Sequence, residues 1–162
     1  MFEWGSKMKA RRWLTLILFV IVSLSAGMFG SRFPPDAWYR GLEKPSWNPP
    51  DFVFAPVWTL LYVLMGIAAW LVWTRGEKGQ RLLPLSVFAV QLGVNALWSW
   101  LFFGMRRPDL AFIDIIVMWV LICVTIVLFW KVKRSAGLLL IPYLAWVSFA
   151  TALNFQLWRL NL

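Results

Sequence analysis

The chain has 162 residues, of which 61% are hydrophobic and only 14% are charged, and its mean hydropathy is +0.70. Soluble domains do not combine such a high apolar fraction with so few charges, so the composition excludes an ordinary soluble domain. The formal net charge is +9, but the basic residues stand in short clusters beside apolar runs. This placement favours contact with lipid headgroups over binding in a nucleic-acid groove, and no nucleic-acid partner is predicted.

Residues that ligate metals are scarce. The chain contains one cysteine, Cys123, and no histidine. A disulfide within one chain is therefore excluded, and imidazole cannot hold zinc or haem. We predict no metal site and no resident cofactor.

Five apolar runs are each long enough to cross a bilayer, which takes about 20 helical residues. They are expected at about 13–30, 52–73, 82–103, 110–130 and 136–158. Pro84 in the first turn of the third run and Gly104 at its end support these limits. The predicted fold is all-α, a five-helix transmembrane bundle that forms a single domain over residues 1–162.

The first run admits two interpretations. A basic segment before it and the small residues Ser23, Ser25 and Ala26 also fit a cleavable signal peptide. However, the apolar run reaches the roughly 18 residues that a spanning helix needs. We therefore favour a retained transmembrane helix.

The distribution of basic residues predicts the orientation in the membrane. Five spans place the two termini on opposite sides, and ten Lys and Arg residues flank the side of the N-terminus against six on the other. The positive-inside rule then places the N-terminus in the cytoplasm and the loop at 31–51 outside. An odd number of spans also argues against a fold made of two inverted halves, which many secondary transporters have.

The length and composition of the segment 31–51 predict an ordered loop. At about 20 residues it is longer than a connection between neighbouring helices requires. Five prolines restrict its backbone. Its large apolar side chains are those of Trp38, Tyr39, Leu42 and Trp47. We expect this loop to act as a lid packed over the mouth of the bundle.

Polar and aromatic residues recur at helical spacing in three of the spans. They are Trp58 and Tyr62 in the second span, Gln91, Asn95, Trp98 and Ser99 in the third, and Tyr143, Trp146, Ala150 and Asn154 in the fifth. Lipid would penalise the polar members, so each stripe should face the bundle interior. Two interpretations stay open. The polar groups link helices by hydrogen bonds of ~1 kcal/mol each, or the stripes surround a cavity with aromatic walls.

Asp114 is the only acidic residue well inside a span. A carboxylate within a membrane is costly and is by default a functional candidate. It lies only about 7 Å below the start of the fourth helix, at 1.5 Å per residue. We therefore favour an ion pair or a hydrogen bond near the membrane interface, with Arg106 and Arg107 as the candidate partners, over a functional role for Asp114.

Small residues recur at Ala89, Gly93 and Ala96 in the third span. Such a pattern lets two helix backbones approach closely. It fits either a contact inside the bundle or the seam of a homodimer, and both interpretations stay open.

Four strings in the sequence resemble, in the same order, motifs of the tryptophan-rich sensory protein/translocator protein family (TspO/MBR), once called peripheral-type benzodiazepine receptors. They are WYRGLEKPSWNPP in the loop, PVWTLLY from Pro56, NALWSWLFFG from Asn95 and PYLAWVSFATALNFQLWRLN from Pro142. The resemblance covers almost the whole chain after residue 12. It implies five transmembrane helices, often in a homodimer. We expect the protein in a bacterial cell membrane.

The resemblance also implies a pocket beneath the first loop. Its ligands in the family are porphyrins such as protoporphyrin IX, synthetic isoquinoline carboxamides and, in animal members, cholesterol. The implied ligand-binding residues are Trp38, Trp47, Trp58, Tyr62, Asn95, Trp98, Ser99, Trp146, Ala150 and Leu153. Phe155 stands where the animal cholesterol motif has a tyrosine, so the resemblance does not extend to cholesterol.

Three functions are consistent with this resemblance. The first is binding of tetrapyrroles for sensing, sequestration or transport. The second is light-dependent breakdown of protoporphyrin IX, for which the family implicates tryptophans that match Trp58 and Trp146. The third is a structural or regulatory role in the membrane. The sequence shows no conventional catalytic constellation, so enzymatic turnover in the dark is not expected.

Overall fold

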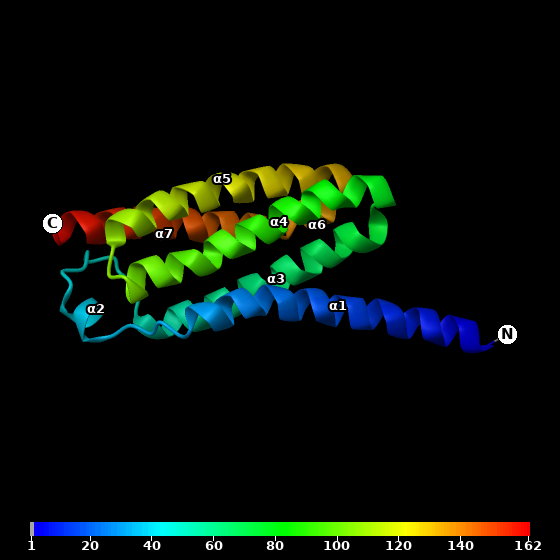
Figure 1. Cartoon of the computed structure of the whole chain (residues 1–162), viewed down its shortest axis with the longest axis horizontal. Helices are drawn as coiled ribbons and strands as arrows, with labels where there is room; N and C mark the ends of the chain where they lie inside the picture. Colours follow the sequence, from blue (N-terminus) through cyan, green and yellow to red (C-terminus); the bar gives the residue numbers. More distant parts are fainter. Residues whose placement is uncertain (1) are drawn as a thin grey trace.

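Five long helices run along one axis and form the bundle (Figure 1). The computed structural model describes the backbone of residues 2–162 and the side chains of residues 11–162 except that of Lys78. The five helices are α1 (Phe2–Gly30), α3 (Phe54–Arg75), α4 (Lys78–Ser99), α5 (Pro108–Val132) and α7 (Ile141–Leu160). No strand occurs in residues 2–162, so the prediction of an all-α bundle is confirmed.

Five segments of these helices are long and apolar enough to cross a bilayer. They are Arg11–Gly30, Asp51–Arg75, Gly79–Gly104, Pro108–Val132 and Arg134–Leu160. Large hydrophobic side chains such as those of Ile17 and Val120 are exposed on the outer faces, as is expected where lipid covers a helix. The chain is therefore an integral, multi-pass membrane protein.

Close packing of the helices builds the core. Helix α1 lies against α3 and α4, and α5 lies against α4 and α7. Met65, Ala68 and Val72 of α3 are completely buried. At Gly66 the backbone of α1 is so near that an added Cβ atom would lie 2.6 Å from Val20 Cα. Glycine at this position therefore allows α1 to approach α3.

Several helix limits differ from the sequence prediction: α1 begins at Phe2 and α4 at Lys78, so Pro84 lies inside α4 and not in its first turn. The span expected as one helix over about 136–158 consists of a short helix, α6 (Arg134–Leu138), a two-residue turn, and α7. Pro142 lies in the first turn of α7, and proline lacks the N–H that a continuous helix would need there. The span expected to end at 103 closes with one π-helical turn, η2 (Trp100–Gly104), which no sequence pattern predicted.

The loop between α1 and α3 lies across one end of the bundle (Figure 1). It contains a short helix, α2 (Ala37–Gly41), and a 3₁₀ turn, η1 (Asp51–Val53). The Asp36 carboxylate caps α2 by accepting a hydrogen bond from the Tyr39 N–H at 3.1 Å. This hydrogen bond, and after it the nearby Arg106 guanidinium, hold the pKa of Asp36 below its ordinary value. Asp36 is therefore ionised at neutral pH.

Two contacts with distant parts of the chain hold the loop in place. Arg106, in the turn before α5, forms a salt bridge with Asp36 at 2.9 Å. Asn161, just after α7, accepts a hydrogen bond from the Glu43 N–H at 2.9 Å and donates one to the Glu43 carbonyl at 3.0 Å. The second contact joins one amide side chain to both backbone groups of Glu43, so it fixes the position of the loop relative to α7.

The small residues Ala89 and Gly93 are exposed on α4. A Cβ atom added at Gly93 would meet no atom within 4 Å. Gly93 therefore makes no close contact with the described residues, and for Ala89 and Gly93 the interpretation as a contact inside the bundle is wrong, whereas Ala96 packs against the core. A homodimer seam at this face stays a prediction.

Replacing Gly66 by alanine should weaken the packing of α1 on α3. The added methyl group would meet backbone atoms of Val20, which cannot move without displacing α1. We expect the free energy of unfolding to fall by about 1–3 kcal/mol, measured by thermal unfolding in detergent micelles. Gly93→Ala is the matched control because its methyl group meets open space. Equal melting temperatures for the two variants would contradict the close approach of α1 and α3.

Replacing Asn161 by alanine should loosen the loop. The variant loses both hydrogen bonds to Glu43, each of which contributes about 1 kcal/mol. Hydrogen–deuterium exchange should become faster at residues 42–44, as read by mass spectrometry. Glu43→Gln is the control, since it removes a charge from the same loop and leaves the backbone groups intact. The proposed anchoring fails if exchange in Asn161→Ala matches that of the unaltered chain.

Candidate functional site

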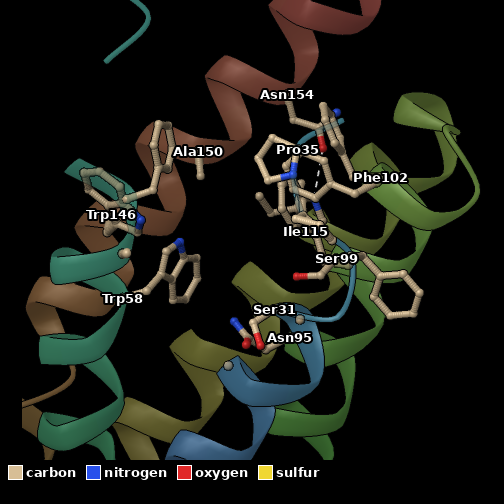
Figure 2. A pocket seen from close by; sticks show the side chains of 18 of the residues that line it. Ser31, Pro35, Trp58, Asn95, Ser99, Phe102, Ile115, Trp146, Ala150 and Asn154 are labelled. Atoms are coloured by element: carbon tan, nitrogen blue, oxygen red, sulfur yellow. Dashed lines mark hydrogen bonds between the residues drawn. The ribbon is translucent and has the colours of Figure 1, made fainter. Parts of the chain in front are cut away.

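A cavity of about 560 Å³ lies between the helices beneath the loop (Figure 2). Residues of α1, α3, α4, α5 and α7 line it, together with Phe33, Pro34 and Pro35 of the loop. Its volume falls in the range of small-molecule sites, about 300–1,000 Å³. Such sites combine apolar and aromatic walls with a few polar groups, and this cavity has the same composition.

Eight of the ten residues assigned to ligand binding from the sequence lie around this cavity. They are Trp58, Tyr62, Asn95, Trp98, Ser99, Trp146, Ala150 and Leu153. The other two, Trp38 and Trp47, are not lining residues. The Trp38 ring packs edge-on against Phe102 at 5.9 Å, and the Trp47 ring packs against Phe149 at 5.7 Å. A ligand contact by any of the ten stays a prediction.

Two stacked pairs of aromatic rings form walls of the cavity. The Trp58 and Tyr62 rings lie 5.5 Å apart with their planes inclined by 28°, and those of Trp98 and Phe102 lie 5.0 Å apart at 20°. Figure 2 shows Trp58 and Trp146 on one side of the cavity and Phe102 on the other. Stacked rings present flat apolar surfaces, which suit a flat apolar ligand.

A hydrogen-bond network lies at the end of the cavity away from the loop and joins three helices. The Tyr62 hydroxyl donates to Asn95 Oδ1 at 2.6 Å, and Asn95 Nδ2 donates to the Tyr143 hydroxyl at 3.2 Å. Gln91 Nε2 donates to the same hydroxyl. All four side chains are buried, so these bonds satisfy polar groups that lipid could not. The interpretation of the polar stripes as links between helices is confirmed for these residues.

Asn154 holds the Trp98 ring in its orientation. Trp98 Nε1 donates to Asn154 Oδ1 at 2.9 Å, and Asn154 Nδ2 donates to the Pro108 carbonyl at 2.9 Å. One buried amide thus connects α4, α7 and the start of α5. This wall of the cavity is therefore fixed by hydrogen bonds as well as by stacking.

Trp146 carries a polar group that the protein leaves unsatisfied. Its Nε1 atom is buried and has no hydrogen-bond acceptor within the described part of the chain. A buried donor without a partner costs about 1–3 kcal/mol. Trp146 lines the cavity, but its Nε1 atom is covered by neighbouring atoms and is not one of the polar groups that face the cavity.

Helix α1 also contributes to the cavity, which the sequence patterns of the other helices did not predict. Gly27 and Gly30 both line it. A Cβ atom at Gly27 would collide with the ring of Tyr62, and one at Gly30 would lie 2.7 Å from Ser99 Oγ. The three-residue spacing of the two glycines, which places them on one helix face, was the signal in the sequence.

The expectation that Asp114 pairs with Arg106 or Arg107 is wrong. Arg106 binds Asp36, and Arg107 donates two hydrogen bonds to Asp109 at 2.6 and 2.8 Å. Arg107 stands two residues before Asp109 and therefore pairs locally at the start of α5. Asp114 is buried a turn and a half further along the helix, and its Oδ2 atom has no partner among the described residues.

The residues that line the cavity are mainly apolar and aromatic, with a few amide and hydroxyl groups. Nowhere in the described residues do three His, Cys, Asp or Glu side chains come together to hold a metal ion. The carboxylate among the lining residues belongs to Asp51, which is exposed at the loop side. Stacking, apolar contact and a few hydrogen bonds are the interactions that this site offers.

Comparison with known proteins agrees with the four sequence motifs. A sequence model of the TspO/MBR family matches residues 16–159. The chain is 45% identical over 152 residues to the tryptophan-rich protein TspO of Chlorobaculum tepidum. This alignment covers 91% of this chain and 96% of that protein. It is 41% identical over 152 residues to protein CrtK of Rhodobacter capsulatus (91% and 95% covered) and 38% identical over 154 residues to the translocator protein of Homo sapiens (92% and 91% covered). The match spans nearly the whole chain at this level of identity, and the chain therefore belongs to the TspO/MBR family.

Proposed function

We propose that this membrane protein binds porphyrins such as protoporphyrin IX, and other flat apolar molecules, in the cavity beneath the loop. The observation that carries the proposal is a cavity of about 560 Å³ whose walls are stacked aromatic rings. A porphyrin is flat, wide and largely apolar, so it can stack on such walls over a large area.

Polar groups at the cavity match the acceptors at the edge of a porphyrin. The Ser99 hydroxyl lies at the cavity and can both donate and accept a hydrogen bond. Asn95 is committed to Tyr62 and Tyr143, so we assign it to holding the cavity floor. Among these polar groups, the orientation of the ligand then depends chiefly on Ser99.

The loop is the lid of this site in our proposal. Phe33, Pro34, Pro35 and Tyr39 of the loop line the cavity, and the contacts of Asp36 and Glu43 hold the loop over it. A ligand that enters from the loop side must displace these contacts. The rate of ligand exchange would then follow the opening of the loop.

Sensing, sequestration and transport would all use the same binding step. Relatives bear the names tryptophan-rich sensory protein, in Cereibacter sphaeroides, and translocator protein, in several mammals. The bacterial relatives and the ten basic residues on the N-terminal side support a bacterial cell membrane with the N-terminus in the cytoplasm. A homodimer through the exposed face of Ala89 and Gly93 fits the same arrangement.

Light-dependent breakdown of the bound porphyrin is a second candidate function. Trp58 contacts two tyrosines, stacking on Tyr62 and meeting Tyr143 edge-on at 6.1 Å. Trp146 belongs to a separate group of rings with Phe54 and Phe149. An excited porphyrin beside Trp58 could take one electron from its indole, with dioxygen as the oxidant that breaks the porphyrin down. Such chemistry needs light and does not need an acid–base pair.

Absorbance spectroscopy separates the two functions. Protoporphyrin IX mixed with the purified protein should show a shifted spectrum in darkness. A shift that stays constant under light identifies a binder. Loss of the porphyrin band under light, slowed in Trp58→Phe and Trp146→Phe, identifies breakdown in the cavity. Absence of any shift would contradict both proposals.

The same two substitutions should weaken binding without abolishing it, because one aromatic pair contributes about 0.5–1.5 kcal/mol beyond buried area. Trp130→Phe is the control, since Trp130 is exposed near the end of α5, far from the cavity. Affinities measured by fluorescence titration should fall for Trp58→Phe and Trp146→Phe alone.

Filling the cavity should exclude bulky ligands. Ala150 lines the cavity on α7, so Ala150→Leu places three more carbon atoms in it and should abolish porphyrin binding in the same titration. Ala152→Leu is the matched control, because Ala152 lies two residues away and is exposed. Porphyrin affinity unchanged in Ala150→Leu would rule out this cavity as the binding site.

A further inference from the structure

A second hollow lies at the end of the bundle opposite to the loop. It is formed where α4 begins and α5 ends, two segments that Figure 1 shows side by side at the end of the bundle away from the loop. We call it the α4–α5 groove, and its volume is about 370 Å³. Its lining residues are Gly79, Gln80, Leu83, Pro84, Leu128, Lys131 and Val132. None of them lines the cavity beneath the loop.

The groove changes from polar to apolar with depth. Lys131 lies in the last turn of α5, and Leu128 lies about one turn nearer to the centre of the bundle. Leu83 likewise follows Gly79 by about one turn in α4. A bilayer core is crossed by about 20 helical residues, whereas α5 has 25. Lys131 therefore lies at the level of the lipid headgroups, and the two leucines lie beside the acyl chains.

The segments around the groove carry a strong positive charge. The neighbouring segments 75–81 and 131–134 contain six basic residues and one acidic residue, Glu77. A positive surface at the headgroup level attracts anionic lipid, by about 1 kcal/mol for each Lys or Arg near the membrane surface. The net charge therefore favours an anionic occupant over a zwitterionic one.

Lys131 is the basic side chain that lines the groove itself. Arg81 is engaged elsewhere, since its guanidinium lies 4.0 Å from the centre of the Trp73 ring and donates to the Trp73 carbonyl at 3.0 Å. Lys131 is exposed, and within the described residues no carboxylate forms a salt bridge with it. Its ammonium group is thus available to an anion.

Pro84 adds a hydrogen-bond acceptor at the rim. Proline has no N–H, so the Gln80 carbonyl four residues earlier cannot receive the usual helical hydrogen bond from it. Gln80 lines the groove and is exposed. The rim therefore presents a cation on α5 and an acceptor on α4, which match a phosphate and a hydroxyl of a lipid headgroup.

We propose that the α4–α5 groove is a binding site for an anionic phospholipid. The phosphate lies at Lys131, a headgroup hydroxyl donates to Gln80, and one acyl chain lies along Leu83 and Leu128. Charge complementarity and the polar-to-apolar order of the lining residues identify the occupant. The proposal is independent of the function assigned to the cavity beneath the loop.

Native mass spectrometry of the protein in detergent micelles tests the site. Dioleoyl phosphatidylglycerol and dioleoyl phosphatidylcholine are titrated separately, and the apparent affinity of the first bound lipid is measured. Phosphatidylglycerol should bind more tightly. Lys131→Gln should lower the affinity for phosphatidylglycerol about fivefold, which corresponds to about 1 kcal/mol, and leave the affinity for phosphatidylcholine unchanged. Lys133→Gln, an equal loss of charge on an exposed residue outside the groove, should change either affinity by much less.

A second variant blocks the groove without changing its charge. A Cβ atom at Gly79 meets no atom within 4 Å, so Gly79→Leu should fold normally and place its side chain at the rim. This variant should lower the affinity for phosphatidylglycerol, as Lys131→Gln does. Inorganic phosphate, added at the same concentration as the lipid, should not compete.

Four outcomes would overturn the proposal. Equal losses in Lys131→Gln and Lys133→Gln, or unchanged binding in Gly79→Leu, would mean that a diffuse basic surface attracts the lipid. Equal affinity for the two lipids would remove the role of the anionic charge. Competition by inorganic phosphate would show a site for the anion alone, without the acyl chain.

Discussion

Hydrogen bonds around Tyr143 and Asn95 decide which faces of the helices point inward. Lipid offers no partner to an amide or a hydroxyl, so these groups must bond to one another inside the bundle. Tyr62 reaches Asn95 from α3, and Gln91 and Asn95 of α4 reach Tyr143 of α7. Once these contacts form, the aromatic rings on the same helix faces, among them Trp58, turn inward as well. The aromatic walls of the cavity are thus a consequence of satisfying the polar groups.

Small residues keep space open between those walls. Gly27 and Gly30 let α1 approach Tyr62 and Ser99 without filling the centre, and Ala150 contributes only a methyl group on α7. The large rings pack in stacked pairs that support one another. The bundle can therefore keep a cavity of about 560 Å³. Flexible aliphatic side chains around a void of this size would move into it and fill it.

The two ends of the bundle have different chemistry. At the loop end, a salt bridge between Asp36 and Arg106 and the bonds of Asn161 to Glu43 join the loop to α5 and α7. At the opposite end, basic residues surround a groove that opens beside α4 and α5. This separation lets contacts with ligands and contacts with lipids be tested by different substitutions.

The all-α bundle, the five spans and the inward-facing stripes could be predicted from the sequence, because apolar length and helical spacing are local properties of the chain. Four motifs in order also identified the family. Only the tertiary structure decided which stripe residues line the cavity and which, such as Gln91 and Tyr143, link helices behind it. It also decided that Asp114 lacks the arginine partner expected for it. Pairing and cavity shape depend on how helices far apart in the chain pack together, and spacing along one helix carries no information on that.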